Sequence, residues 1–243
     1  NVMLIQNMLH QGLFGQLRHC EAGYQHYVGS YASRSARAKD GKAHTGNSYP
    51  THAIGPIAQW MDVNRGNRFD YLVSMSADGT RGSHNADINT SLIHTTNGQT
   101  VTLYYDTRLP RPYDLIYRVQ GTKGIYMATL DQIYIEGRTK KPYTWETMEE
   151  YYKEFEHPLW KAMSQTARQE GGHGRADWMT VERVIGALRT GTAPDMDVYD
   201  AATWSCITEL TEKSVAQKSQ PMDFPDFTKG RWKTNPPIGI IGA

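Results

Sequence analysis

Residues 88–106 read INTSLIHTTNGQTVTLYYD, and this stretch decides the fold. Residues Ile88 to Thr95 and Val101 to Asp106 alternate apolar and polar types and are rich in β-branched and aromatic residues, as half-buried strands are. Asn97-Gly98 between them is the pair preferred in tight hairpin turns, because both residues tolerate positive φ. The stretch therefore predicts a hairpin of two antiparallel strands.

The period of two extends to both sides of this hairpin, from Arg68 to Glu136. The further strands predicted in this region are Phe69 to Val73, Tyr113 to Gln120, Gly124 to Met127 and Gln132 to Ile135, joined by short polar or glycine-containing turns. Upstream, Leu17 to Tyr27 reads as another strand. Short connections favour pairing between neighbours, so we expect an antiparallel meander in one continuous sheet.

Helical periodicity flanks the predicted sheet. The first helix has Val2, Ile5, Met8 and Leu9 at helical spacing and ends near Gly12 and Gly15. The other predicted helices are Pro50 to Val63, Thr144 to Gln169 with gaps, Arg175 to Arg189 and Val198 to Gln217. We expect one α+β domain over 1–243, with a core sheet at about 17–136, a helical part at about 144–218 and an extended tail at 219–243.

Composition and motifs exclude several classes of function. The chain has 243 residues and a formal net charge of +1, which argues against binding to nucleic acid or to an anionic membrane. No apolar run approaches the about 20 residues that a membrane-spanning helix needs. Cys20 and Cys206 are interpreted as small buried hydrophobic residues, without a disulfide framework. The chain lacks HExxH, CxxC and GxSxG, so neither a metal site nor a serine-hydrolase site is expected.

Candidate chemistry lies where a long loop meets a helix. Gly29 to Gly46 shows no periodicity, and loops of this length are often functional. Tyr49 precedes His52 by three residues, so on a helical turn the two side chains can share a face and divide acid and base roles. A purely structural pair is the alternative. Arg111-Pro112-Tyr113 is either a rigid turn or a means of aiming Tyr113 into a pocket. Gly171 to Gly174 precedes a helix but lacks phosphate-loop spacing.

An ordered set of short segments covers nearly the whole chain. The segments are GLFG at 12–15, GYQH at 23–26, NSYPTHAIGP at 47–56, NRG at 64–66, RFDY at 68–71, PRPY at 110–113, QGTKG at 120–124, PDMDVYDAA at 194–202 and FPDF at 224–227. Together they resemble the C-terminal portion of the Gfo/Idh/MocA oxidoreductase superfamily. The most similar branch is glycoside hydrolase family 109, the NAD-dependent α-N-acetylgalactosaminidase type. Ser48, where related dehydrogenases carry an Asp, favours this glycosidase branch.

The resemblance implies the fold, the cofactor and the site. It implies a large, mostly antiparallel open sheet with helices on one face, and NAD held mainly by an N-terminal Rossmann domain that this chain does not contain. The implied substrate contacts are Arg37, Tyr49, Pro50, Thr51, His52 and Tyr113, and the implied NAD contact is Asn1. The implied reaction is transient oxidation at sugar C3, elimination and addition of water, with His52 near the C3 hydroxyl and Tyr49 as the acid/base near C2.

Two other functions stay open. One is a sugar dehydrogenase that uses NAD or NADP and releases the reduced cofactor, and the other is a non-catalytic sugar-binding or dimerisation module. A carbohydrate is the expected ligand, and a large sheet with an uncovered face favours a homo-oligomer. The chain begins inside a helix without a methionine, which favours a fragment of a longer bacterial protein. By itself it is expected to bind NAD poorly and to be inactive, and its cellular compartment, sugar and anomer are not predicted.

Overall fold

The computed structural model of the protein describes residues 1–28, 44–79, 85–163 and 176–237. These residues are arranged around one large β-sheet. Within these residues the sheet has nine strands in the order β8-β7-β6-β5-β1-β4-β3-β2-β9. The strands are β1 Leu17–Gln25, β2 Phe69–Ala77, β3 Ile88–Thr95, β4 Thr100–Asp106, β5 Arg118–Gly121, β6 Gly124–Met127, β7 Gln132–Ile135, β8 Glu146–Thr147 and β9 Met222–Asp223. The predicted open and mostly antiparallel sheet is confirmed.

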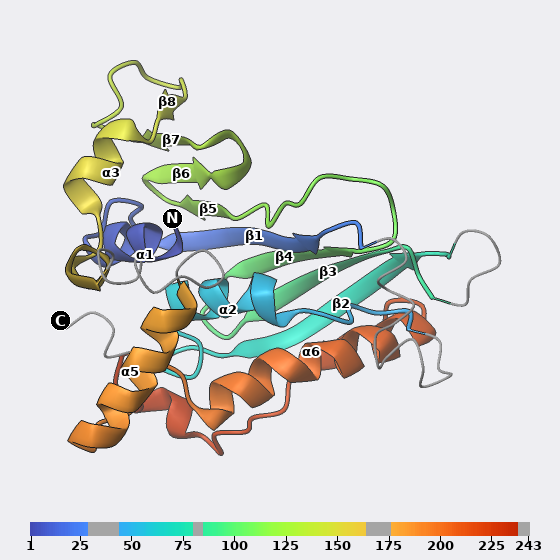
Figure 1. The fold of residues 1–243 in the computed structure, drawn as a ribbon. Coiled ribbons are helices and arrows are strands. Elements are labelled where there is room, and N and C mark those ends of the chain that lie inside the picture. Colours follow the sequence, from blue (N-terminus) through green and yellow to red (C-terminus); the bar gives the residue numbers. More distant parts are fainter. Residues whose placement is uncertain (29–43, 80–84, 164–175, 238–243) are drawn as a thin grey trace.

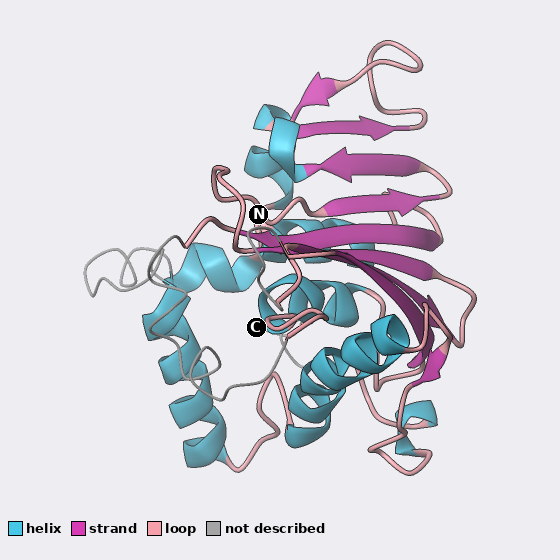
Figure 2. Ribbon diagram, turned by 90° about the vertical axis from the view of Figure 1, so that its right-hand side faces the viewer, coloured by secondary structure: helices cyan, strands magenta, loops and turns pink. Residues whose placement is uncertain are grey.

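The helices of the described residues all lie on one face of this sheet and leave its other face without a helix (Figures 1 and 2). They are α1 Val2–His10, α2 Thr51–Trp60, α3 Glu149–Phe155, α5 Ala176–Thr190 and α6 Val198–Ala216, with short 3-10 turns at Ala128–Leu130 and Arg231–Lys233. The core forms where α1, α2 and α6 lay apolar side chains on the sheet. Ile5, Ile54 and Ile207 from these helices are fully buried, as are Leu72 and Leu103 from the strands.

The predicted antiparallel meander is wrong at one strand. Strand β1 lies between β5 and β4 and runs parallel to β4, with Cys20 opposite Val101. A parallel pair needs a long crossover connection. The chain supplies one, because the segment that contains α2, β2 and β3 separates β1 from β4. The remaining neighbours pair antiparallel, including the hairpin of β3 and β4 that the sequence predicts.

Two strand predictions differ from the structure in their extent. The strand expected from Tyr113 begins only at Arg118. Pro110 and Pro112 lack backbone N–H donors, and Ile116 has a left-handed φ of 67°, so the residues before 118 form a turn. The tail expected to be irregular contributes β9, which pairs Met222 with Leu72 at the edge of the sheet.

A buried ion pair joins the start of α6 to the turn after α2. Asp200, which is 3% exposed, accepts hydrogen bonds from both terminal nitrogens of Arg65, at 2.8 and 2.7 Å. The Asn64 amide donates to the same carboxylate at 3.2 Å. Asp200 also completes a capping box with Asp197 at the N-terminus of α6. This group of polar contacts holds α6 in register against the rest of the core.

The two cysteines differ in their burial. Cys20 is fully buried and Cys206 partly buried, and both are free thiols. Burial raises the pKa of each thiol, and for Cys206 the value is about 12. Among the described helices, none combines the length and the apolar character that crossing a lipid bilayer requires.

Candidate active site

Aromatic and imidazole rings from distant parts of the chain converge at one end of β1. They are Tyr24, His26, Tyr49, His52 and Tyr113, called the aromatic cluster below. Tyr24 lies at its centre, with ring centroids 4.7 Å from Tyr49, 5.3 Å from His52, 6.0 Å from His26 and 6.2 Å from Tyr113. Tyr49 and His52, the pair singled out by spacing, are 4.8 Å apart. The structure thus brings together residues that the sequence separates widely.

The segment before α2 is fixed against α6. The backbone N–H of Asn47 donates to the Thr211 hydroxyl at 2.9 Å, and the Asn47 side-chain oxygen accepts from the N–H of Tyr49 at 3.0 Å. Gly46 allows the close approach, since a Cβ there would lie 2.5 Å from Thr211 Oγ1. Pro50 then precedes the first residue of α2. The chain therefore enters α2 along a path set by α6, and this path directs Tyr49 to Tyr24.

A second anchored turn carries Tyr113. The buried carboxylate of Asp106 accepts from the backbone N–H groups of Arg108 and Leu109, both at 3.1 Å. The Arg111 guanidinium donates to the Gln25 side chain at 2.7 Å, which ties the turn to the end of β1. Tyr113 follows and packs edge-on against His26 at 5.3 Å. Arg111 and its flanking prolines thus form a rigid turn, and this turn directs Tyr113 towards the aromatic cluster.

Phenol groups in the cluster are stabilised in the neutral form. Burial, and then the neighbouring Tyr49, Tyr113 and Tyr105, raise the pKa of Tyr24 above its ordinary value. Burial followed by Tyr49 raises the pKa of Tyr113 in the same way. Both phenols consequently keep their protons at neutral pH and act as hydrogen-bond donors. A site with these two protonated phenols and further aromatic rings beside them suits an uncharged polyhydroxylated ligand, because each ring offers an apolar face and a polar edge.

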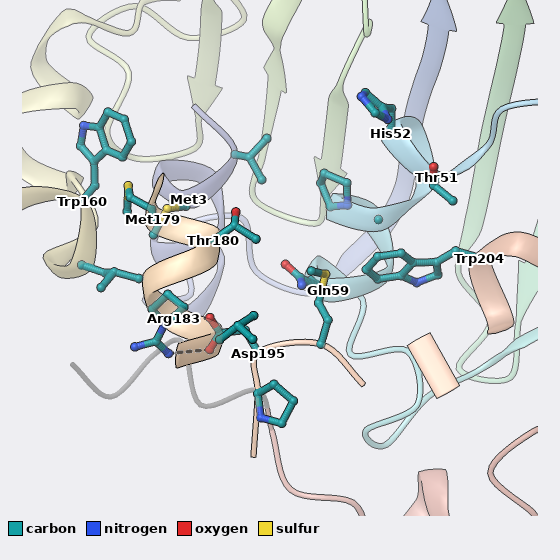
Figure 3. Close-up of a pocket in the computed structure, with 17 residues that line it drawn as sticks. Met3, Thr51, His52, Gln59, Trp160, Met179, Thr180, Arg183, Asp195 and Trp204 are labelled. Carbon is teal, nitrogen blue, oxygen red and sulfur yellow. Dashed lines mark hydrogen bonds and ion pairs between the residues drawn. The ribbon is translucent and has the colours of Figure 1, made fainter. Parts of the chain in front are cut away.

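A cavity of about 430 Å³ lies on the other side of α2 (Figure 3). Thr51, His52 and Gln59 of α2 line one side of it, with Trp204 of α6. The facing wall is formed by α5 and includes Met179, Thr180 and Arg183, and the Arg183 Nε donates to Asp195 at 2.8 Å. Val2 and Met3 of α1 close another side. Of the aromatic cluster, His52 alone lines this cavity, so it is the residue shared by both spaces.

The sequence-predicted residues divide into three groups. Tyr49 and His52 lie in the cluster together with Tyr113, while Pro50 and Thr51 connect the first two. Asn1 lies apart from the cluster, where its amide donates to the Tyr126 hydroxyl at 3.2 Å, next to the residues of α1 that line the cavity. Arg37 and the segment 171–174 lie outside the described residues.

Tyr24 and His26 are the members of the cluster that the sequence prediction missed. Both belong to the GYQH segment at 23–26, which carries part of the family resemblance. The alternation of β1 places Tyr24 on the same face as the buried Cys20 and Ala22, which is the face covered by helices. Nothing in the strand itself shows that this end of β1 meets the start of α2. No group of three His, Cys, Asp or Glu in the described part of the chain is arranged to hold a metal ion.

Solved structures share the fold of this chain. Levoglucosan dehydrogenase in complex with NADH has a TM-score of 0.67 at 15% identity, covering 92% of this chain and 62% of that chain. Myo-inositol 2-dehydrogenase from Lactobacillus plantarum has a TM-score of 0.61 at 11% identity, covering 92% of this chain and 61% of that chain. The chain therefore has the sheet-bearing fold found in the C-terminal portion of Gfo/Idh/MocA dehydrogenases.

The family follows from the sequence comparison. The family model described as Glycosyl hydrolase 109, C-terminal domain, matches residues 1–86 and 80–234, and the chain belongs to this family. A Glycosyl hydrolase family 109 protein of Shewanella sp. strain W3-18-1 is 40% identical over 269 residues. An α-N-acetylgalactosaminidase of Shewanella oneidensis is 39% identical. These matches cover 99% of this chain and 58% of each relative, so the chain spans well under two thirds of their length. The predicted family is confirmed.

Proposed function

We propose that this chain forms the substrate side of the active site of an NAD-dependent glycosidase that acts on α-N-acetylgalactosaminides. The observation that carries the proposal is the aromatic cluster, in which Tyr49 and His52 lie 4.8 Å apart beside Tyr24. The substrate class comes from the name of the Shewanella oneidensis relative. Arg37, Pro50, Thr51 and Tyr113 are proposed as further substrate contacts.

The residues around His52 fit a nicotinamide cofactor in part. The cavity that touches His52 is lined largely by apolar side chains, including Met3, Met179 and Trp204, and such walls suit a flat aromatic ring. The chain has no GxGxxG segment, so the phosphates would be bound by the portion of the relatives that this chain does not span. We propose Asn1, adjacent to the cavity-lining Val2, as this chain's contact with NAD. When bound, NAD supplies the hydride acceptor, and later the hydride donor, for one sugar carbon.

The chain's own residues would move protons. His52 holds the C3 hydroxyl and accepts its proton while that carbon is oxidised. The resulting C3 ketone acidifies the neighbouring C2 proton, which Tyr49 in its deprotonated form removes as the bond from C1 to the leaving group breaks, and the leaving group departs as an alcohol with a proton from solvent. Water then adds its hydroxide at C1 and releases a proton to solvent, Tyr49 delivers to C2 a proton that has exchanged with solvent, and the proton held by His52 returns to the C3 oxygen as that carbon is reduced. Tyr24 and Tyr113, as neutral phenols, donate hydrogen bonds to the sugar.

A direct assay separates this function from the dehydrogenase alternative. The full-length protein is incubated with NAD and p-nitrophenyl α-N-acetylgalactosaminide, and absorbance is followed for nitrophenol and for NADH. We expect nitrophenol release without net NADH, because the hydride is returned in each cycle. Stoichiometric NADH from a free sugar, with the glycosidic bond left intact, would instead establish a sugar dehydrogenase; the two solved proteins of the same fold are named as dehydrogenases of levoglucosan and of myo-inositol.

The uncovered sheet face is proposed to bind a second copy of the protein. Met75 is 67% exposed, Leu92 51% and Tyr71 37%, and all three lie on this face of β2 and β3. Across the same face Arg118 binds Glu21 at 2.5 Å, so the charges there are already neutralised and do not repel an identical surface. In Figure 2 the described helices lie on the opposite face of the sheet. Exposed apolar side chains on the face without helices favour a two-fold interface.

Replacing Leu92 with glutamate is therefore expected to convert a dimer into a monomer, because it places a charge at the apolar centre of the interface. Light scattering of the purified protein measures the mass. The matched control is Leu188→Glu, which alters an exposed leucine on α5, away from the sheet. A wild-type protein that is monomeric, or a Leu92→Glu variant that stays dimeric, would contradict the proposed interface.

A further inference from the structure

The backbone of His52 is held from outside its own helix. In an α-helix the carbonyl of residue 52 usually accepts from the N–H of residue 56, but α2 has Pro56 at that position, and proline has no N–H. The Tyr117 hydroxyl donates to the His52 carbonyl oxygen at 2.5 Å. A side chain just before β5 thus provides the hydrogen bond that the helix sequence removes, at the residue placed in the candidate active site.

Tyr117 itself is firmly fixed. Its side chain is 8% exposed and packs edge-on against Trp60, the last residue of α2, at 5.6 Å. Its backbone carbonyl accepts from the N–H of Ala128 at 2.9 Å. Burial raises the pKa of the Tyr117 phenol, so the hydroxyl keeps the proton that it donates. Tyr117 therefore contacts both the first and the last turn of α2.

The turn before Tyr117 is strained. Ile116 has a φ of 67°, in the left-handed region that a β-branched residue rarely adopts. Its N–H donates to the Asp114 carboxylate at 2.7 Å, which holds the turn closed. Gly23 makes room for it, because a Cβ at that position would lie 3.3 Å from the Ile116 Cδ1. This turn starts at Tyr113, in the aromatic cluster, and ends at Tyr117, against α2.

We propose that Tyr117 is a positioning residue, which holds His52 at the distance from Tyr24 and Tyr49 that the reaction needs. The inference rests on the proposed function, in which His52 contacts the substrate. The geometry explains why a proline at position 56 and a strained residue at position 116 both occur in one site. Pro56 lacks the N–H that residue 56 of a helix would donate to the His52 carbonyl, and the turn at Ile116 brings the Tyr117 hydroxyl to that carbonyl.

The first test removes the hydroxyl alone. Tyr117→Phe in the full-length enzyme is expected to lower kcat roughly tenfold with KM nearly unchanged, because a small displacement of a reacting group slows the chemical step more than it weakens binding. The matched control is Tyr151→Phe, since Tyr151 is also buried and donates to Glu146 at 2.6 Å, remote from the cluster. Both variants are expected to lose a similar amount of thermal stability, but only Tyr117→Phe is expected to lose turnover.

The second test restores the missing donor. Pro56→Ala gives position 56 an N–H that can bind the His52 carbonyl, so adding it to Tyr117→Phe is expected to recover a large part of the lost kcat. A Tyr117→Phe variant that keeps wild-type kcat, or a loss equal to that of Tyr151→Phe, would overturn the positioning role.

A third readout does not depend on catalysis. The protein is labelled with ¹³C at the histidine Cε1, and the NMR signal of His52 is identified by its absence in the His52→Asn variant. This signal is expected to shift in Tyr117→Phe and to keep its position in Tyr151→Phe. If the full-length protein cleaves no glycoside, the proposed function fails, and the His52 NMR signal alone then tests whether Tyr117 positions His52. A His52 signal that does not shift in Tyr117→Phe would contradict that positioning role.

Discussion

His52→Ala is expected to lower the turnover of the full-length enzyme by about 10²–10⁴-fold, the range that a positioned acid or base contributes. His52 is the residue that belongs to both the aromatic cluster and the cavity beside α2. Its removal takes away the group proposed to accept the C3 hydroxyl proton. Tyr49→Phe is expected to cause a loss in the same range, because the ring remains while the acid/base hydroxyl is removed.

The control for this prediction is His10→Ala, which changes an exposed histidine at the end of α1. It is expected to leave kcat and KM unchanged. Thermal melting of all three variants shows whether they are folded at the assay temperature. Turnover by His52→Ala or Tyr49→Phe at the wild-type level, in folded protein, would remove these residues from the mechanism.

Asp200→Ala is expected to lower the free energy of unfolding by about 3–5 kcal/mol, the cost of removing one partner of a buried ion pair. Asp200 is buried and Arg65 is partly buried, with side-chain exposures of 4% and 9%. The substitution would leave the guanidinium of Arg65 without its bidentate partner and would also break the capping box of α6. Since α6 holds the segment that leads to Tyr49, turnover is expected to fall at temperatures where the variant begins to unfold.

Urea denaturation followed by circular dichroism measures this change. The control is Glu154→Ala, which removes the carboxylate that Arg138 binds on the exposed surface of α3, and it is expected to leave the midpoint unchanged. An Asp200→Ala midpoint equal to that of the control would mean that the polar group around Arg65 does not stabilise the fold.

Local structure was predictable where one segment contained the whole signal. The hairpin of β3 and β4 is such a case, because alternation defines both strands and Asn97-Gly98 defines the turn between them. The pairing of β1 was not predictable in this way. Its alternation shows which side chains face the core, but the choice of β4 and β5 as neighbours depends on how the later strands assemble.

In the candidate site, too, the features set by local sequence were predictable and those set by tertiary contacts were not. The spacing of Tyr49 and His52 on a helix start indicated that they share a face, and the structure has them 4.8 Å apart. Tyr24 was missed because its role depends on contacts between β1 and α2, which no local pattern encodes. Ile116 was assigned to a strand because β-branched residues favour strands, whereas the tertiary contacts hold it in a left-handed turn.

The most direct test of the central claim is hydrolysis in D₂O. The full-length enzyme is given an α-N-acetylgalactosaminide in D₂O, and the released sugar is analysed by ¹H NMR and mass spectrometry. Elimination through C2 predicts one solvent deuterium at C2 of the product, with cleavage and deuterium incorporation slowed together in Tyr49→Phe. Cleavage that leaves the original hydrogen at C2 would contradict the proposed mechanism and the role assigned to Tyr49.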